Sequence, residues 1–324
     1  MPRIISERYG RVIVRALVVS NMRPDAGHPE RGHFVRDQVR GLRGLPNTEV
    51  ELFEFPPGPP ALLAAALSLL RRRLARQAFD VVHAHFGLTA WPALAAPARI
   101  RALTVHGTDV NHPRTRALTA AALRLGAFDI VAAVSPALVE QLPGASGMVL
   151  PCGVDLDRFV PISRLDARAQ LGLEAAGRYL LFPADPRRPE KRVELAQSLA
   201  RQTQAHLLTL GGVAPERVPL LIAASNAVVV PSEREGFGLA VLEALACDVP
   251  VLATPVGVHA EALAGVAGTL CAPFELERWT PVAEAHLAES DPRIAGRAAA
   301  EPFSAVVMAE RVRDAWERAL GESE

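Results

Sequence analysis

Residues 231–246, which read PSEREGFGLAVLEALA, contain the residue types and spacing that most strongly indicate a ligand-binding site. Glu235 lies beside a Gly-Phe-Gly turn, and Glu243 follows it by eight positions in an apolar stretch that predicts a helix. Unpaired N–H groups and the dipole at a helix start favour an anion, and carboxylates accept hydrogen bonds from sugar hydroxyls. The segment therefore predicts a site for a sugar and an anion. The simpler interpretation is a capped helix that follows a loop glutamate.

A basic loop is the second candidate site. Residues 181–192 read LFPADPRRPEKR, and they place Arg187, Arg188 and Lys191 after a predicted strand. Lys191 is the only lysine among the 35 basic residues, which indicates a need for a compact ammonium charge. A guanidinium group holds two oxygens at once, and a departing diphosphate needs such neutralisation. The loop predicts a diphosphate site, unless it is only an exposed basic loop.

The third candidate site is in residues 104–111, TVHGTDVN. A predicted strand delivers His106 and Asp109 on either side of Gly107. An imidazole and a carboxylate at a strand end can orient a sugar or relay a proton. A single histidine at a strand end more often has a structural role.

These candidate sites follow strands of a predicted α/β architecture. Apolar stretches alternate with helical ones along the chain, which is typical of doubly wound parallel sheets. A first series of strands is predicted at residues 12–20, 50–55, 80–85, 101–106 and 129–135. A second series is predicted at residues 179–182, 206–210, 227–230 and 249–253. Because ligands of such sheets bind at the carboxyl ends of strands, we expect a cleft between two Rossmann-like halves to hold the site.

Length and composition agree with a folded chain of two domains. The chain has 324 residues, half of them apolar and 22% charged. The turn-rich stretch LPCGVDLDR predicts a linker, and a long amphipathic helix is predicted near the end. The predicted domains are residues 1–153, residues 154–302 and a C-terminal helix within residues 303–324.

The net charge is zero, but its sign differs between the two halves. Residues 1–150 carry a net charge of +7, and residues 151–324 carry −7. The basic part suits an anionic substrate or surface. Aromatic residues make up only 5% of the chain, so we expect no nucleic-acid partner.

Cysteine usage and hydropathy indicate a cytoplasmic setting. Three distant cysteines give no disulfide pattern, and the sequence shows neither a transmembrane stretch nor the apolar core of a signal peptide. Residues 61–76 are apolar first and then basic. This stretch predicts either a peripheral contact with the inner face of a membrane or a buried helix with a solvated basic end.

Two motifs give weak indications of a metal. Asp155 and Asp157 form a DxD pair in the predicted linker, and His83 and His85 face one side of a predicted strand. The DxD pair does not follow a strand end, and the histidine pair has no third ligand at a suitable spacing. The sequence also has no GxGxxG motif after a strand and no P-loop. We therefore expect no metal and no cofactor.

The chain resembles the family 4 retaining glycosyltransferases of the GT-B fold. The resemblance covers nearly the whole chain, and its carriers are NMRPDAGHPERGHFVRDQV, VVHAHFG, TVHGTDV, VSPALVEQL, LPCGVDLDRF, ADPRRPEKR and PSEREGFGLAVLEALACDVPVLATPVG. The ADPRRPEKR loop is similar to that of members named for teichuronic acid and other surface-polysaccharide synthesis. The resemblance implies two Rossmann-like domains that face a cleft, with a final helix that crosses back to the first domain.

The resemblance also implies site residues. Those expected to be catalytic are Glu235, Lys191, Arg188 and His106. Those expected to bind the donor are Gly32, Arg187, Asp109, Gly236, Phe237, Gly238, Leu239 and Glu243. Glu235 would hold hydroxyls of the transferred sugar, Glu243 the ribose, and Lys191 the diphosphate. The family commonly has its arginine in a Gly-Arg-Leu several residues before the lysine; Asp185 and Pro186 stand there instead. Whether Arg187 or Arg188 contacts the diphosphate therefore stays open.

The implied activity is transfer of a sugar from a nucleotide-diphosphate sugar to a hydroxyl of a glycan, lipid-linked or small-molecule acceptor. The anomeric configuration would be kept, and no metal would be required. One alternative is another GT-B enzyme, such as a nucleotide-sugar epimerase or a sugar phosphorylase. A second is a non-catalytic scaffold that binds a sugar nucleotide. The sugar, the base, the acceptor and the oligomeric state are not predicted.

Overall fold

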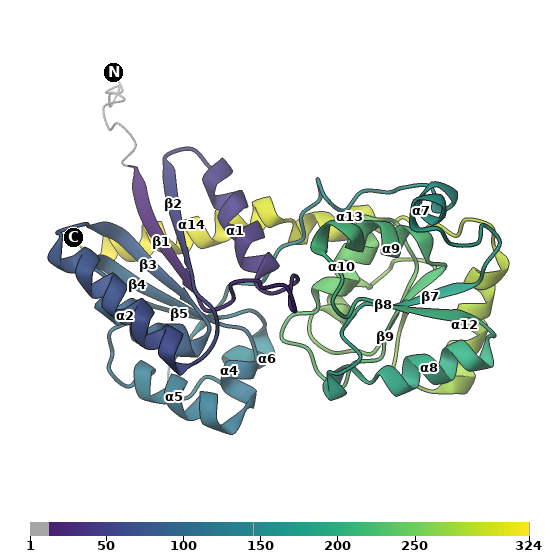
Figure 1. The fold of residues 1–324 in the computed structure, drawn as a ribbon, viewed down its shortest axis with the longest axis horizontal. Coiled ribbons are helices and arrows are strands. Elements are labelled where there is room, and N and C mark those ends of the chain that lie inside the picture. Colours follow the sequence, from purple (N-terminus) through teal and green to yellow (C-terminus); the bar gives the residue numbers. More distant parts are fainter. Residues whose placement is uncertain (1–12, 145, 324) are drawn as a thin grey trace, which may run out of the picture.

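A six-stranded parallel sheet forms the N-terminal half of the computed structural model, which describes residues 13–144 and 146–323 (Figure 1). Its strand order is β2-β1-β3-β4-β5-β6. The strands are β1 Val14–Ser20, β2 Thr48–Glu54, β3 Phe79–His85, β4 Ala98–Val105, β5 Ile130–Ala133 and β6 Met148–Val149. Strand β1 reads VRALVVS and is buried except at Arg15, because helices cover both faces of the sheet. Residue 12 of the predicted first strand lies outside the described residues.

A five-stranded parallel sheet forms the C-terminal half, with the order β11-β10-β9-β7-β8. Its strands are β7 Tyr179–Phe182, β8 His206–Thr209, β9 Ala227–Val230, β10 Val251–Ala253 and β11 Leu270–Cys271. The two sheets confirm the predicted pair of doubly wound parallel units. Strands β6 and β11 have two residues each, too few for a periodic signal, and the sequence analysis missed both.

Helices cover each sheet on both sides. Their bounds are α1 His33–Gly44, α2 Pro59–Leu74, α3 Ala90–Ala95, α4 Thr108–Asn111, α5 Pro113–Leu123, α6 Pro136–Val139, α7 Arg164–Leu171, α8 Val193–Gln202, α9 Val218–Ala224, α10 Leu239–Ala246, α11 His259–Ala262, α12 Leu276–Ala288, α13 Arg297–Ala300 and α14 Ala305–Glu322. On the first sheet, Val39 of α1 and Trp316 of α14 pack in one core. Leu69 of α2 and Ala93 of α3 pack in another core, so these helices cover the opposite face.

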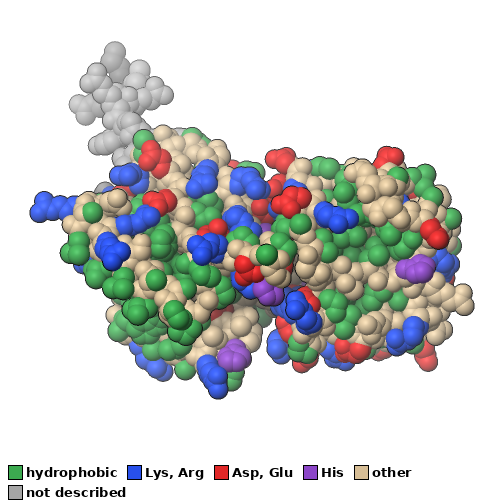
Figure 2. All heavy atoms as spheres, viewed as in Figure 1, with side chains coloured by type: hydrophobic (Ala, Val, Ile, Leu, Met, Phe, Trp, Pro, Cys, Tyr) green, Lys and Arg blue, Asp and Glu red, His purple; other side chains and the backbone are tan. Residues whose placement is uncertain are grey.

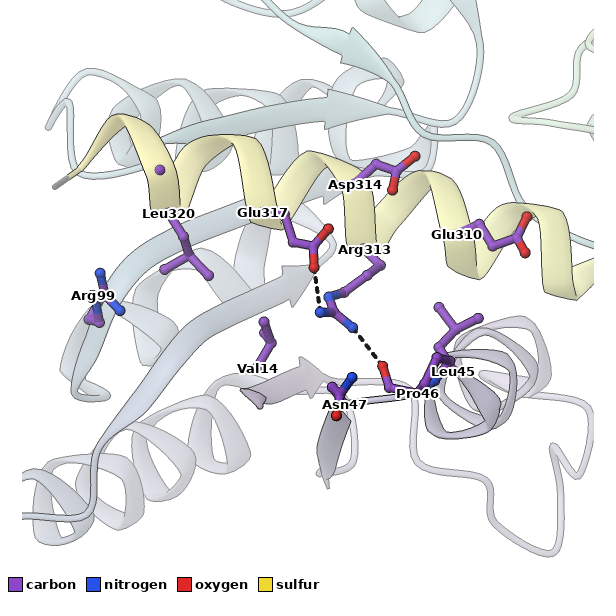
Figure 3. Close-up of a pocket in the computed structure, with 11 residues that line it drawn as sticks. Val14, Leu45, Pro46, Asn47, Arg99, Glu310, Arg313, Asp314, Glu317 and Leu320 are labelled. Carbon is purple, nitrogen blue, oxygen red and sulfur yellow. Dashed lines mark hydrogen bonds and ion pairs between the residues drawn. The ribbon is translucent and has the colours of Figure 1, made fainter. Parts of the chain in front are cut away.

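Helix α14 joins the end of the chain to the first half (Figure 1). The two crossings between the halves pair with each other: the Val154 N–H donates to the Phe303 carbonyl at 2.9 Å, and the Ala305 N–H donates to the Val154 carbonyl at 2.8 Å. Ser304 caps the helix by accepting from the Val307 N–H at 3.2 Å. Arg313 then pairs with Glu317 and donates to a carbonyl of the loop before β2 (Figure 3). The predicted return of the last helix is confirmed.

A cavity of about 530 Å³ lies between α14 and the first sheet (Figure 3). Val14, Asn47 and Arg99 line it, so it lies at the amino ends of the strands. Ligands of parallel sheets bind at the opposite edge, at the carboxyl ends of the strands. No helix within residues 13–144 and 146–323 combines the length and the apolar character that crossing a bilayer requires.

Candidate functional site

The carboxyl ends of strands from both sheets surround a cavity of about 550 Å³. Its lining comes from the loops after β1, β3, β4, β5 and β6 in the first half, from those after β7 and β9 in the second, and from helices α1 and α10. The predicted site residues that line it are Gly32, His106, Arg188, Lys191, Glu235, Gly236, Phe237, Gly238, Leu239 and Glu243. Of the predicted set, Arg187 and Asp109 lie outside this lining. The fold thus gathers residues from positions 32 to 243 around one cavity.

Lys191 and Glu235 form an ion pair in this cavity. The lysine Nζ lies 2.6 Å from Oε1 and 2.5 Å from Oε2, and the Ser232 hydroxyl donates to Oε1 at 2.7 Å. Both side chains are largely buried. Burial raises the pKa of Glu235, but the Lys191 charge and these hydrogen bonds lower it below the ordinary value, so the carboxylate is ionised. An ammonium has three N–H groups, so Lys191 can hold a phosphate oxygen while it keeps Glu235.

The loop that carries Lys191 ends in a tight turn just before α8. Residues Pro189–Lys191 form a 3-10 turn, and α8 begins only at Val193. Arg192 between them has a left-handed φ of 59°, which separates the two helical pieces. The lysine is therefore held at the end of a tight turn.

The structure places the two candidate arginines differently. Arg187 is exposed, and its guanidinium pairs with Asp185 at 2.7 Å. Arg188 pairs with Glu190 at 2.7 Å and lines the cavity beside Lys191. Of the two arginines, only Arg188 is part of the lining of this cavity.

Helix α10 begins at the cavity wall. Gly238 precedes its first residue, Leu239, and no side chain caps this helix start. Gly236 lies against the other half of the molecule, where a Cβ at this position would come within 2.2 Å of the His106 carbonyl oxygen. The backbone of the two halves thus meets directly at a glycine.

A second glycine, Gly32, allows the chain to enter α1 beside the cavity. Its φ is 68°, in the left-handed region, and a Cβ here would lie 2.4 Å from the Met22 carbonyl oxygen. The next residue, His33, places Nε2 3.7 Å from an oxygen of Glu243 in the second half. Burial lowers the pKa of His33, but the nearby carboxylate of Glu243 raises it by more, so it lies above the usual value. The sequence analysis missed His33; its place directly after the loop glycine is the signal.

His106 enters the cavity as a neutral imidazole. Burial lowers its pKa to about 3. Its ring lies between Phe34 and Phe86, with centroids 4.9 and 4.7 Å away, and its Nε2 is 3.0 Å from Nδ1 of buried His85. His83 stacks on His85, and its Nδ1 accepts from the Trp316 indole N–H at 3.2 Å, so both partners of this ring lie within the core. The sequence analysis missed the two phenylalanines, whose side-chain types alone do not distinguish a site wall from a core.

Asp109 supports the turn that carries His106. Its carboxylate accepts backbone N–H groups from His106 at 3.0 Å, Gly107 at 2.8 Å and Gly87 at 3.1 Å. These bonds occupy the oxygens that the predicted donor contact would use. The geometry therefore favours a positioning role for Asp109.

We expect Asp109→Asn to lower the free energy of unfolding by about 1–3 kcal/mol, because an amide NH₂ leaves buried N–H groups without an acceptor. Turnover is expected to fall with the displacement of His106. Urea unfolding and initial rates measure the two effects. Asp129→Asn is not used as the control, because Asp129 also accepts a backbone N–H, that of Arg101. Exposed Glu216→Gln is the matched control. Unchanged stability in Asp109→Asn would contradict the positioning role.

The comparisons with known proteins agree with this arrangement. Residues 7–158 match the model of Glycosyltransferase Family 4, and residues 165–288 match that of Glycosyl transferases group 1. A D-inositol 3-phosphate glycosyltransferase of Actinosynnema mirum is 30% identical, over 85% of this chain and 79% of the relative. TuaC of Bacillus subtilis, named for teichuronic acid biosynthesis, is 31% identical over 55% of this chain and 54% of its own length. The chain belongs to glycosyltransferase family 4.

Solved structures show the same fold for this glycosyltransferase. HepE of Anabaena, in a complex with UDP and glucose, superposes with a TM-score of 0.68 at 17% identity, over 94% of this chain and 100% of that one. Sucrose-phosphate synthase of Thermosynechococcus elongatus gives 0.67 at 18% identity, over 95% and 100%. The fold is GT-B, as the sequence resemblance implied. The enzyme takes its sugar from a nucleotide sugar, and its family is retaining and works without a metal.

The two motifs with weak metal signals have other partners in this glycosyltransferase. Asp155 accepts from Arg40 at 2.7 Å and from the N–H groups of Asp157 and Arg158. His83 is held by Trp316, as described above. In the part of the chain that the structure describes, no group of three or more His, Cys, Asp or Glu side chains is placed to hold a metal ion.

Proposed function

We propose that this glycosyltransferase binds its donor mainly against residues 154–302 and its acceptor against residues 1–153, with residues 303–324 tying the two together. The arrangement of Lys191, Glu235 and Arg188 beside the start of α10 carries this proposal. It places cationic groups for a diphosphate and a carboxylate for sugar hydroxyls in one cavity. The paired crossings at Val154 and Ser304 support the proposed division of the chain.

In the proposed reaction, the acceptor hydroxyl attacks the anomeric carbon on the face from which the diphosphate leaves. The bond from that carbon to the diphosphate oxygen breaks, the bond to the acceptor oxygen forms, and the leaving phosphate oxygen takes the acceptor proton. Lys191 and Arg188 offset the charge that develops on the diphosphate. Glu235 and neutral His106 hold hydroxyls of the sugar, and Glu243 holds the ribose.

We place the nucleobase in a neighbouring cavity of about 360 Å³. It shares Arg188, Lys191 and Glu243 with the main cavity, so it continues the path from sugar to diphosphate to ribose. Its apolar walls are Pro183, Leu210, Val213, Pro215 and Val218. Because solved HepE complexes contain UDP and UDP-glucose, UDP is the first nucleotide to test.

A thermal-shift screen against UDP, GDP, ADP, dTDP and CMP tests the donor site. One diphosphate is expected to raise Tm, because a ligand present at about 100 times its Kd adds about 2.7 kcal/mol to stability. EDTA is expected to leave that shift unchanged. Arg188→Gln is expected to reduce the shift, with Arg187→Gln as the matched control. No shift with any nucleotide, or equal effects of the two arginine variants, would contradict the proposed site.

On the acceptor side, a smaller cavity of about 210 Å³ adjoins the main one. The two cavities share Met22, Arg31, Phe86 and Thr108. We propose that it takes the hydroxyl-bearing end of a glycan or lipid-linked acceptor. Arg31, whose guanidinium pairs with Asp25 at 2.7 Å, adds a positive charge to its wall. Three free cysteines support a reducing, cytoplasmic setting for this reaction.

A further inference from the structure

Helix α2 turns an apolar stripe to solvent. Leu63, Leu67, Leu70 and Leu74 are spaced by four, three and four residues, so they lie on one side of the helix. These leucines are between 41% and 75% exposed. The opposite side, with buried Leu69, packs on the sheet. An ordinary surface helix shows the reverse pattern, with its polar side outward.

The apolar surface continues over the neighbouring helices of the same face. Trp91 of α3, Leu118 of α5 and Leu125 just after α5 are all at least 40% exposed. Helices α2 and α3 pack against each other, and α3 contacts α5. Figure 2 shows hydrophobic side chains gathered over α2 in this part of the first half. We call this surface the leucine face; its residues are Leu63, Leu67, Leu70, Leu74, Trp91, Leu118 and Leu125.

Positive charge borders the leucine face. The exposed arginines are Arg71, Arg73, Arg76, Arg114, Arg116 and Arg124. At about 100° of rotation per residue, Arg71 and Arg73 lie on either side of the leucine stripe. Residues 59–76, 86–97 and 113–126 contain no Asp or Glu at all. The leucine face therefore combines exposed apolar side chains with charges of positive sign only.

We propose that the leucine face docks on an anionic lipid bilayer. Leucine and tryptophan side chains enter the boundary between headgroups and acyl chains, and each nearby arginine adds about 1 kcal/mol from the lipid charge. The helices of the leucine face offer no carboxylate to basic groups of a protein partner. An anionic bilayer needs only apolar and positively charged side chains, so the charge pattern favours the bilayer.

The position of the face adds a consequence for the acceptor, which rests on the proposed function. Pro57, two residues before α2, and Thr115 of α5 both line the smaller cavity of the first half. A bilayer under the leucine face would therefore lie close to the proposed acceptor cavity. An acceptor anchored in that bilayer could reach the sugar without leaving the lipid.

Vesicle flotation of the full chain tests the docking. We expect binding to phosphatidylcholine vesicles that contain phosphatidylglycerol, weaker binding at high salt, and little binding to phosphatidylcholine alone. The variant with Leu67→Ser and Leu74→Ser is expected to bind at least about tenfold less, because two apolar side chains no longer insert. Arg71→Gln with Arg73→Gln is expected to remove most of the preference for anionic vesicles.

Leu165→Ser with Val306→Ser is the matched control, since these exposed apolar residues lie outside the leucine face. Tm and the nucleotide-induced shift are expected to stay unchanged in every one of these variants, which separates docking from donor binding. Three outcomes would overturn the proposal: no binding to either vesicle, equal binding of the leucine variant and the wild type, or equal binding to neutral and anionic vesicles. If the wild type does not bind vesicles but self-associates, and the leucine variant does not self-associate, the leucine face would instead be the contact with a second copy of this chain.

Discussion

Replacement of Lys191 by methionine is expected to lower kcat by about 100- to 1000-fold, the loss seen when a preorganised group that stabilises transition-state charge is removed. The ammonium lies at the end of the turn Pro189–Lys191, within hydrogen-bond distance of both Glu235 oxygens. We expect it to meet negative charge that grows on the leaving diphosphate, so its loss affects the transition state more than the bound donor. The Kd for the nucleotide diphosphate is therefore expected to change less than kcat.

This variant also leaves Glu235 buried without its cation, so stability must be separated from catalysis. Breaking one side of a buried ion pair can cost about 3–5 kcal/mol. The double variant Lys191→Met with Glu235→Gln removes both charges together and is expected to recover most of the lost Tm. Its turnover is expected to stay low, because neither group is restored.

Single-turnover rates and thermal unfolding of the two single variants and the double variant check this prediction. Arg192→Met is the control for general damage to the loop, because Arg192 is next to the lysine, is only half-buried and pairs with Glu194. Near-normal turnover in Lys191→Met and in Glu235→Gln would refute the assignment of the pair to catalysis.

The architecture of this enzyme was predictable from local pattern. Buried parallel strands such as Ala227–Val230 are continuous runs of apolar residues, and the loops that carry Lys191 and Glu235 follow them directly. Because all strands of a sheet are parallel, their carboxyl ends meet at one edge, and residues far apart in sequence converge there. For this reason ten of the twelve predicted site residues line one cavity.

The remaining features depend on tertiary contacts that local pattern does not contain. Arg187 and Arg188 are chemically identical, and only the turn geometry directs one of them to the cavity. Asp109 is a residue type that often binds ligands, but in this fold its carboxylate oxygens accept hydrogen bonds from backbone N–H groups. His33 meets Glu243 only because the two halves face each other. In each case, the deciding partner lies far away in the sequence or in a loop without periodicity.

The leucine stripe of α2 shows a related limit. Its apolar start and basic end were visible in the sequence, and they fitted both a buried helix and a membrane contact. The choice depends on which side faces the sheet, and the structure turns Leu69 inward and Leu63 outward. The amphipathic pattern predicts that the helix has two different faces, but only its packing shows which face lies against the sheet.

Gly236→Ala is expected to lower kcat/KM by about 100-fold without unfolding either half. A Cβ at residue 236 would lie 2.2 Å from the His106 carbonyl oxygen, so the two halves must move apart to admit it. The φ of Gly236 is not in the left-handed region, and alanine can therefore adopt its backbone conformation. The cost falls on the contact across the cleft, where a displacement of about 1 Å between donor and acceptor groups can slow a reaction about 100-fold.

Gly44→Ala is the matched control, because a Cβ at Gly44 meets no atom within 4 Å. Initial rates at varied donor and acceptor concentrations, with thermal unfolding of both variants, separate a wider cleft from a damaged fold. A large fall in rate at unchanged Tm in Gly236→Ala alone would mean that the reaction needs the halves in backbone contact. Wild-type rates in Gly236→Ala would mean that the sugar is transferred with the cleft open, and His106 would then be too distant to hold it.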